Sequence, residues 1–268
     1  MQKGIKIVMM IHATRRAKII TIGNSKGGVG KTTTSSIIAW LLAKKYNVLA
    51  VDMDVQADMS KFLLNIKRED LTRFDDAGVY KAIQTGDAAP YVITSPLPDR
   101  TLDVLPASEH LALYDASSFE DYQKLSKALE TIRDKYDFIL IDTPPTISSF
   151  VISSILASDF VIGMVQTHRF AMDQIESYME KVKDIRKYKP TIKYAGMVVA
   201  MFERTKNNQK FLDAIRDVYG KLVFNTTILK RSRLADMTID GLSDKRAADK
   251  KALEQYIQLA KEIEHVTN

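Results

Sequence analysis

Short apolar runs alternate with amphipathic stretches along this chain. The apolar runs predict strands at residues 17–24, 47–53, 101–106, 137–142, 159–165, 192–201 and 222–228. The amphipathic stretches predict helices at residues 31–46, 121–135, 169–188, 207–219 and 245–264. Some strands are almost continuously apolar, as at Phe138 to Ile141, which is typical of strands buried on both faces of a parallel sheet. The pattern therefore predicts an α/β fold with a doubly wound, mostly parallel sheet flanked by helices, and a ligand site at the carboxyl ends of the strands.

A glycine-rich run follows the first predicted strand and leads into the first predicted helix. It comprises Lys26, Gly27, Gly28, Val29, Gly30, Lys31, Thr32 and Thr33, which we call the glycine loop. Glycines let successive backbone N–H groups turn toward phosphate oxygens, and the helix N-terminus adds a positive dipole. In such a loop Lys31 reaches the terminal phosphates and the Thr32 hydroxyl ligates Mg²⁺. The strict phosphate-loop pattern has Gly where this chain has Ser25, but the context predicts a nucleotide site.

Composition narrows the class of protein. The chain has 268 residues, of which 46% are hydrophobic, and no Cys, which excludes disulfides, thiolate zinc sites and iron–sulfur ligation by its own side chains. No apolar run approaches the roughly 18–20 residues of a membrane-spanning helix. We therefore expect a cytoplasmic protein with a basic N-terminal extension over residues 1–16 and a single domain over residues 17–268.

Three segments carry a resemblance to a known family. The early lysine in Lys26-Gly27-Gly28-Val29-Gly30-Lys31-Thr32 resembles the deviant Walker A loop of the ParA/MinD ATPases. Asp52-Met53-Asp54-Val55-Gln56 resembles the Asp-x-Asp-x-Gln segment of that family, and Phe138 to Pro145 resembles its Walker B strand. The segments occur in family order, and weaker similarity continues to about residue 240. Two departures are Ala57-Asp58 in place of Gly-Asn, and Gln166-Thr167-His168-Arg169 in place of a Pro/Glu-containing loop.

The resemblance implies roles for individual residues. ATP and Mg²⁺ are the expected cofactors, with Thr32, Asp54 and Asp142 around the metal and Lys31 on the phosphates. Asp54 is the expected water-orienting residue, whereas Asp52 supports the loop or the magnesium waters. Lys26 is expected to cross a dimer interface to the nucleotide of the partner. Met201 and Phe202 are expected to flank the adenine, although a plain core role is as good an interpretation for Met201.

Positive charge is concentrated in one segment. Residues 181–233 contain 14 Lys and Arg but only four Asp and Glu, although the whole chain has a net charge of only +6. Such asymmetry fits binding to a nucleic-acid backbone, but the charge count alone fits a solvated surface equally well. The family resemblance favours DNA and implies four contact residues: Arg204, Lys230, Arg231 and Arg233.

The resemblance implies a small ParA-type DNA partition ATPase. Such a protein forms an ATP-dependent homodimer, binds nonspecific DNA, and is released when a ParB-type centromere-binding adaptor stimulates hydrolysis. We expect it to be cytoplasmic, nucleoid-associated and independent of membranes. The alternative is a MinD-like positioning ATPase acting at the membrane, which would need a terminal amphipathic helix, whereas residues 253–264 are balanced in charge and predict a helix packed on the domain. An amide ligase on the same loop would need a second substrate site, and none is recognisable.

Overall fold

A single mixed sheet organises the described part of the chain. The structure is a computed structural model and describes residues 16–24, 26–98 and 101–268, so that predictions for residues 1–15 lie outside it. The strands are β1 (Lys18–Gly23), β2 (Val48–Asp52), β3 (Ile93–Thr94), β4 (Leu102–Leu105), β5 (Phe138–Asp142), β6 (Phe160–Val165), β7 (Lys193–Phe202) and β8 (Val223–Leu229). They lie in the order β3-β4-β2-β5-β1-β6-β7-β8, and β3 alone among them runs antiparallel to its neighbour.

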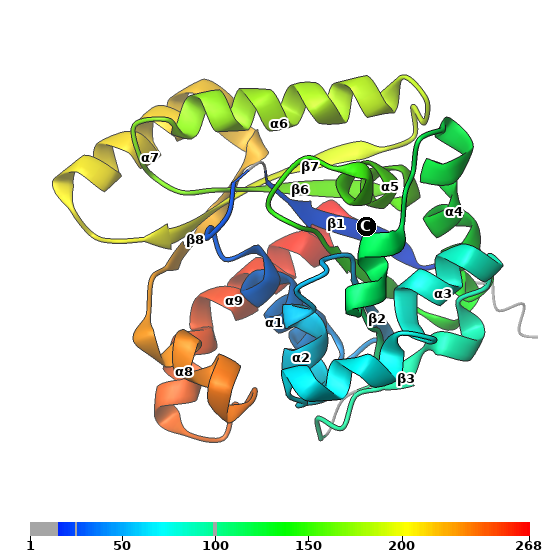
Figure 1. Cartoon of the computed structure of the whole chain (residues 1–268). Coiled ribbons are helices and arrows are strands. Elements are labelled where there is room, and N and C mark those ends of the chain that lie inside the picture. Colours follow the sequence, from blue (N-terminus) through cyan, green and yellow to red (C-terminus); the bar gives the residue numbers. More distant parts are fainter. Residues whose placement is uncertain (1–15, 25, 99–100) are drawn as a thin grey trace, which may run out of the picture.

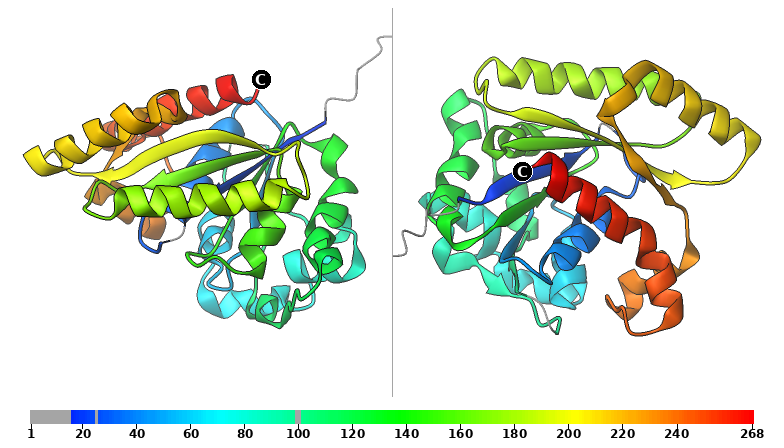
Figure 2. Two further views of the ribbon diagram at one scale, coloured as in Figure 1. Left: turned by 90° about the horizontal axis from the view of Figure 1, so that it is seen from above. Right: turned by 180° about the vertical axis from the view of Figure 1, so that it is seen from behind.

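Helices cover both faces of this sheet (Figure 1). They are α1 (Lys31–Leu42), α2 (Asp58–Leu64), α3 (Gly78–Thr85), α4 (Phe119–Glu130), α5 (Ser149–Ala157), α6 (Ala171–Arg186), α7 (Lys206–Tyr219), α8 (Ser232–Asp240) and α9 (Ala247–Val266). Short 3-10 turns lie at Arg68–Phe74, Ala89–Tyr91, Glu109–Leu113, Arg133–Lys135 and Gly220–Leu222. Helices α4, α5 and α6 lie on one face, whereas α1 and α9 lie on the other, as the two views of Figure 2 show. The predicted doubly wound α/β class is therefore confirmed.

The central strands are buried because helices cover them on both sides. Every residue of β2, β5 and β6 is buried, which explains their near-continuous apolar sequences. All seven predicted strands are present within two residues of their predicted ends, and five predicted helices correspond to α1, α4, α6, α7 and α9. The sequence prediction did not include the two-residue strand β3 or the helices α2, α3, α5 and α8. These helices have seven to nine residues, so each offers about two turns of periodic signal.

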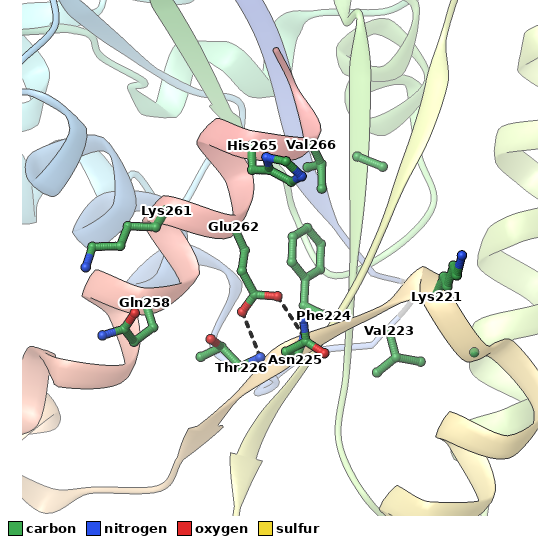
Figure 3. Close-up of a pocket in the computed structure, with 12 residues that line it drawn as sticks. Lys221, Val223, Phe224, Asn225, Thr226, Gln258, Lys261, Glu262, His265 and Val266 are labelled. Carbon is green, nitrogen blue, oxygen red and sulfur yellow. Dashed lines mark hydrogen bonds between the residues drawn. The ribbon is translucent and has the colours of Figure 1, made fainter.

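Helix α9 closes the β8 edge of the sheet. Its Glu262 carboxylate accepts hydrogen bonds from the backbone N–H groups of Asn225 and Thr226, both at 2.8 Å (Figure 3). The pairing register between β7 and β8 shifts at this point, so these N–H groups need a partner outside the ladder. The groove beside them, of about 880 Å³, is also lined by Lys221, Lys261 and His265. Figure 3 shows Lys221 and Lys261 pointing away from one another, so their charges do not converge on one point of the groove.

Candidate nucleotide site

The glycine loop joins β1 to α1 at the carboxyl edge of the sheet. Gly28 and Gly30 have φ values of +76° and +84°, a region that favours glycine, and Gly30 is the N-cap of α1. Lys31 begins α1, is only 6% exposed, and donates a hydrogen bond from Nζ to the carbonyl oxygen of Lys26 at 3.1 Å. The ammonium group of Lys31 thus contacts the glycine loop itself, and it would give up this hydrogen bond to reach a phosphate. Lys26 itself is exposed.

Asp142 lies at the end of β5 beneath the first turn of α1. Its Oδ1 accepts a hydrogen bond from Ser35 Oγ at 3.0 Å, and the Thr32 hydroxyl also hydrogen-bonds to this carboxyl group. Burial and the neighbouring Asp52 raise the pKa of Asp142 to about 7, whereas the Thr32 and Ser35 hydroxyls and Lys31 oppose that rise. Burial lowers the pKa of Lys31, and Asp142 and Asp54 oppose that lowering. These mutual effects place Lys31, Asp142 and Asp54 in one electrostatic cluster.

Asp52 and Asp54 follow the neighbouring strand β2 and have different surroundings. Asp52 is fully buried, and its carboxylate accepts hydrogen bonds from the backbone N–H of Asp54 at 3.1 Å and from the backbone and hydroxyl of Ser60 at 2.8 and 2.6 Å. Burial raises its pKa to about 6 despite these hydrogen bonds. Asp54 is half-buried, and its Oδ1 accepts a bond from Gln56 N at 3.0 Å. The Asp52 carboxylate is thus engaged with the backbone after β2 and with Ser60, whereas Asp54 lies closer to the surface.

Residues beyond the glycine loop contact it from two sides. The side-chain amide of Gln166, in the loop after β6, donates to the Gly28 carbonyl oxygen at 2.9 Å. On the other side, a methyl group placed on Gly30 would lie 3.8 Å from Cγ and Sδ of Met201. Met201 itself has φ +53°, which is costly for a residue with a Cβ and common at functional sites. The structure thus brings Met201 to the loop.

Phe202, by contrast, is not brought to the site. Its side chain is 5% exposed and packs in a cluster with Val165, Ile175 and Leu212. The regular alternation along β7 is interrupted at Met201, which has φ +53°, so that Phe202 packs on the same face of the sheet as Val199. The expectation that the Phe202 side chain flanks the adenine is therefore corrected to a core role.

The donor set of this site fits a magnesium ion that is shared with a phosphate. Asp142 Oδ2 is buried and has no hydrogen-bond partner among the described residues, and the Thr32 hydroxyl lies beside the same carboxyl group. Among residues 16–24, 26–98 and 101–268, no group of three Asp, Glu or His side chains is arranged to hold a metal ion by itself. Mg²⁺ bound to a nucleotide needs only one or two protein oxygens together with phosphate and water. The available oxygens therefore suit a nucleotide-bound magnesium rather than a protein cage.

The four predicted DNA-contact residues have different environments. Arg204 is exposed just before α7, and Lys230 is exposed after β8 but forms an ion pair with Glu203 at 2.7 Å. Arg231 is half-buried, and its Nε has no partner among the described residues. Arg233 pairs through Nε with the fully buried carboxylate of Asp249 at 2.8 Å. Arg233 is thus engaged inside the domain, where the sequence prediction had placed it on a DNA-facing surface.

A groove of about 710 Å³ opens beside the glycine loop between α2 and α8. Thr32 and Thr33 lie at one end, and Asp58 and Lys61 of α2 line its side. Asp58 is one of the two residues that replace the usual Gly-Asn, and its carboxylate pairs with Lys61 at 2.6 Å. Asp58 thus lies at the edge of the groove, where Lys61 balances its charge.

Sequence reasoning missed three residues that shape this region: Ser35, Gln166 and Asp249. Ser35 offered a signal, because a helical residue four positions after Lys31 lies on the same helix face. Gln166 had been noted only as a departure from the family loop. Asp249 offered no signal, because its partner Arg233 lies 16 residues away on another helix.

Comparisons with known proteins agree with this geometry. The profile of the AAA domain family matches residues 17–194. The chain is 31% identical over 262 residues to the sporulation initiation inhibitor protein Soj of Bacillus subtilis, covering 92% of this chain and 98% of Soj. It is also 31% identical over 258 residues to the chromosome-partitioning ATPase Soj of Treponema pallidum, covering 92% and 96%. A plasmid partition protein from Borrelia burgdorferi, solved with AMPPNP, shares the fold with a TM-score of 0.76 at 23% identity, covering 94% of this chain and 98% of that one.

Proposed function

Because the chain belongs to the ParA/MinD family of P-loop ATPases, we propose that it is an ATP-dependent DNA partition ATPase. In this proposal it dimerises on ATP, binds DNA without sequence preference, and is released when a ParB-type adaptor stimulates hydrolysis. It would act in the cytoplasm in association with the nucleoid. The observation that carries the proposal is the clustering of Lys31, Asp54 and Asp142 around the glycine loop while Lys26 stays exposed.

Nucleotide binding would use the loop as it stands. The N-terminus of α1 and the loop N–H groups would face the phosphates, and Lys31 would exchange the Lys26 carbonyl for a phosphate oxygen. Thr32 and Asp142 would hold Mg²⁺ directly or through a water molecule. The ion would neutralise charge on the phosphates, which is the main requirement of phosphoryl transfer.

Hydrolysis requires a group that orients water without binding the phosphates. Asp54 fits this role because it is half-buried at the strand end, while its backbone is fixed by the buried Asp52. Asp52 cannot take the role, because its two oxygens are occupied by Asp54 N and Ser60. Within this Asp-x-Asp segment, Asp52 would therefore hold the backbone and Asp54 would orient the attacking water.

Dimerisation and DNA binding would use exposed cations on two parts of the surface. Lys26 is exposed and available to a partner nucleotide. Arg204, Lys230 and Arg231 follow the carboxyl ends of the neighbouring strands β7 and β8 and would contact DNA phosphates. Two copies would double this surface, so that affinity for DNA would depend on ATP.

The membrane-acting alternative gains no support from α9. Most of its apolar residues, including Leu253, Tyr256 and Leu259, are buried against the domain, and only Ile257 and Val266 among its large apolar side chains are exposed. In the described residues no helix combines the length and apolar character needed to cross a membrane.

Binding to random-sequence duplexes with ATP or ADP tests the proposal. We expect ATP-dependent binding that weakens steeply as salt rises, because counterion release supplies most of the affinity. Arg204→Glu should abolish this ATP-dependent DNA binding. Lys127→Glu is the control, because it reverses the same charge on α4, outside the basic segment, and should leave DNA binding intact. Equal binding with ATP and ADP, or unchanged binding by Arg204→Glu, would contradict the proposal.

A further inference from the structure

Lys230, one of the predicted DNA-contact residues, forms an ion pair with Glu203 of the same chain. Lys230 Nζ lies 2.7 Å from Glu203 Oε1, and the two side chains are 58% and 52% exposed. Glu203 directly precedes Arg204, so the carboxylate lies within the basic segment proposed to meet DNA. We propose that Glu203 is an internal competitor for DNA phosphate, which holds Lys230 in the nucleotide-free chain and limits its DNA affinity. This inference rests on the proposed function.

The backbone holds both partners of this pair in place. Lys230 N donates to the carbonyl oxygen of Phe202 at 3.1 Å, which ties the end of β8 to the residue before Glu203. The Glu203 carbonyl accepts bonds from Thr205 N at 2.7 Å and from Asn208 Nδ2 at 3.0 Å. Thr205 is also the N-cap of α7, where its hydroxyl accepts from Asn208 N. Because the backbone is already ordered, less entropy is lost when the long side chains pair.

The pair is also connected to the nucleotide loop. Met201 lies two residues before Glu203, adopts φ +53°, and packs its side chain on Gly30. The segment that positions Glu203 therefore begins beside the glycine loop. We infer that ATP binding weakens the Glu203–Lys230 pair and makes Lys230 available to phosphate.

Glu203→Gln tests this competition, because it removes the charge and keeps the size of the side chain. In ADP the variant should bind random duplex DNA up to about fivefold more tightly per protomer, which is the scale of an exposed ion pair. The slope of log affinity against log salt should steepen by about 0.9 for each Lys230 that gains a phosphate. With ATP the gain over the parent should be smaller, because the pair is already weakened.

Asp217→Asn is the matched control. Asp217 is an exposed carboxylate on α7 in the same basic half, so its loss changes the net charge equally without releasing Lys230. The gain of Glu203→Gln should also vanish in a Lys230→Gln background, as a double-mutant cycle measures. Equal gains from Glu203→Gln and Asp217→Asn, or a gain that persists without Lys230, would overturn the competition. A gain that is equal with ATP and ADP would overturn the connection through Met201.

Retention on heparin separates this inference from the proposed function. Heparin is a polyanion, so Glu203→Gln should elute at higher salt than the parent and Asp217→Asn. If that order holds while no variant binds duplex DNA with ATP, the partition function fails and the competition for Lys230 stands. If the parent binds DNA with ATP but all three proteins elute together, the competition fails and the function stands.

Discussion

The side-chain amide of Gln166 donates a 2.9 Å hydrogen bond to the carbonyl oxygen of Gly28 and so connects the loop after β6 to the glycine loop. The bond gives this carbonyl oxygen a partner within the chain, so that in the proposed complex the N–H groups of the loop would serve the phosphate oxygens. Burial and the nearby Lys26 lower the pKa of His168, which shows that the same loop also approaches the predicted cross-dimer lysine. The segment that departs from the family pattern therefore contacts the glycine loop.

Gln166→Ala should weaken ATP binding about fivefold, the scale of one neutral hydrogen bond. Gln166→Glu should weaken it further, because a carboxylate would face the Gly28 carbonyl. Isothermal titration with MgATP measures both. Gln209→Ala is the control, because the Gln209 amide donates to the Asp213 carboxylate on the exposed face of α7. Parental affinity in both Gln166 variants would show that the loop does not need this bond.

Asp54→Asn should lower single-turnover ATP hydrolysis by at least about a hundredfold, the lower end of what a positioned acid–base group contributes. ATP affinity should change little, because the Lys31, Thr32 and Asp142 contacts remain. Asp58→Asn, four residues along and paired with Lys61, is the control for local charge. Hydrolysis at the parental rate by Asp54→Asn would move the water-orienting role to another residue, with Asp142 the next candidate.

Gly23→Ala should destabilise the chain by about 1–3 kcal/mol through overpacking. A methyl group at Gly23 would lie 2.0 Å from the buried Tyr178 hydroxyl, so the α6 side chain would have to move. Urea unfolding measures the loss, and Tyr178→Phe should recover part of it by removing the clashing oxygen. Gly86→Ala is the comparison, because a methyl group there would meet no atom within 4 Å, whereas Gly86 has φ +74°. Its stability loss therefore measures backbone strain without a clash. An unchanged midpoint for Gly23→Ala would refute the close contact.

The central sheet and the nucleotide loop could be predicted from the sequence because both are local patterns. The apolar run Phe138 to Ile141 predicts β5, and residues 26–33 predict a phosphate loop, without knowledge of any distant residue. The small helices α2 and α8 could not be predicted so easily, since their apolar residues face other helices over only about two turns.

Side-chain roles that depend on distant partners could not be predicted. Arg233 and Lys230 are similar basic residues in sequence, yet one pairs with buried Asp249 and the other with exposed Glu203. Met201 and Phe202 are adjacent, yet only Met201 packs on the glycine loop. For the two cations the difference arises from their tertiary neighbours, and for Met201 and Phe202 it arises from the positive φ of Met201, which interrupts the alternation along β7.

Asp142→Asn should change the pH dependence of stability. The carboxyl pKa is 3.8 in the unfolded reference and about 7 in the folded chain, so the folded chain binds the proton more tightly. The resulting contribution to the free energy of unfolding is full below about pH 4 and is lost as the pH rises through about 7. The variant should therefore be up to about 4 kcal/mol more stable than the parent at pH 8 and similar to it at pH 4. Urea unfolding at both pH values measures this, and an equal difference at both would contradict a protonated Asp142. Asp217→Asn is the exposed control.

Arg233→Ala should destabilise the fold by about 3–5 kcal/mol, because it leaves the fully buried Asp249 carboxylate without its cation. Burial alone would raise the pKa of Asp249, but Arg233 and Ser243 hold it below its ordinary value, so the charge persists at neutral pH. Lys230→Ala removes a similar charge from an exposed pair and should cost less than about 1 kcal/mol. Thermal unfolding compares the two, and Arg233→Ala combined with Asp249→Ala should recover much of the loss, because the unpaired charge is then absent. A stability loss no larger for Arg233→Ala than for Lys230→Ala would return Arg233 to the exposed surface and make it a direct candidate for DNA contact.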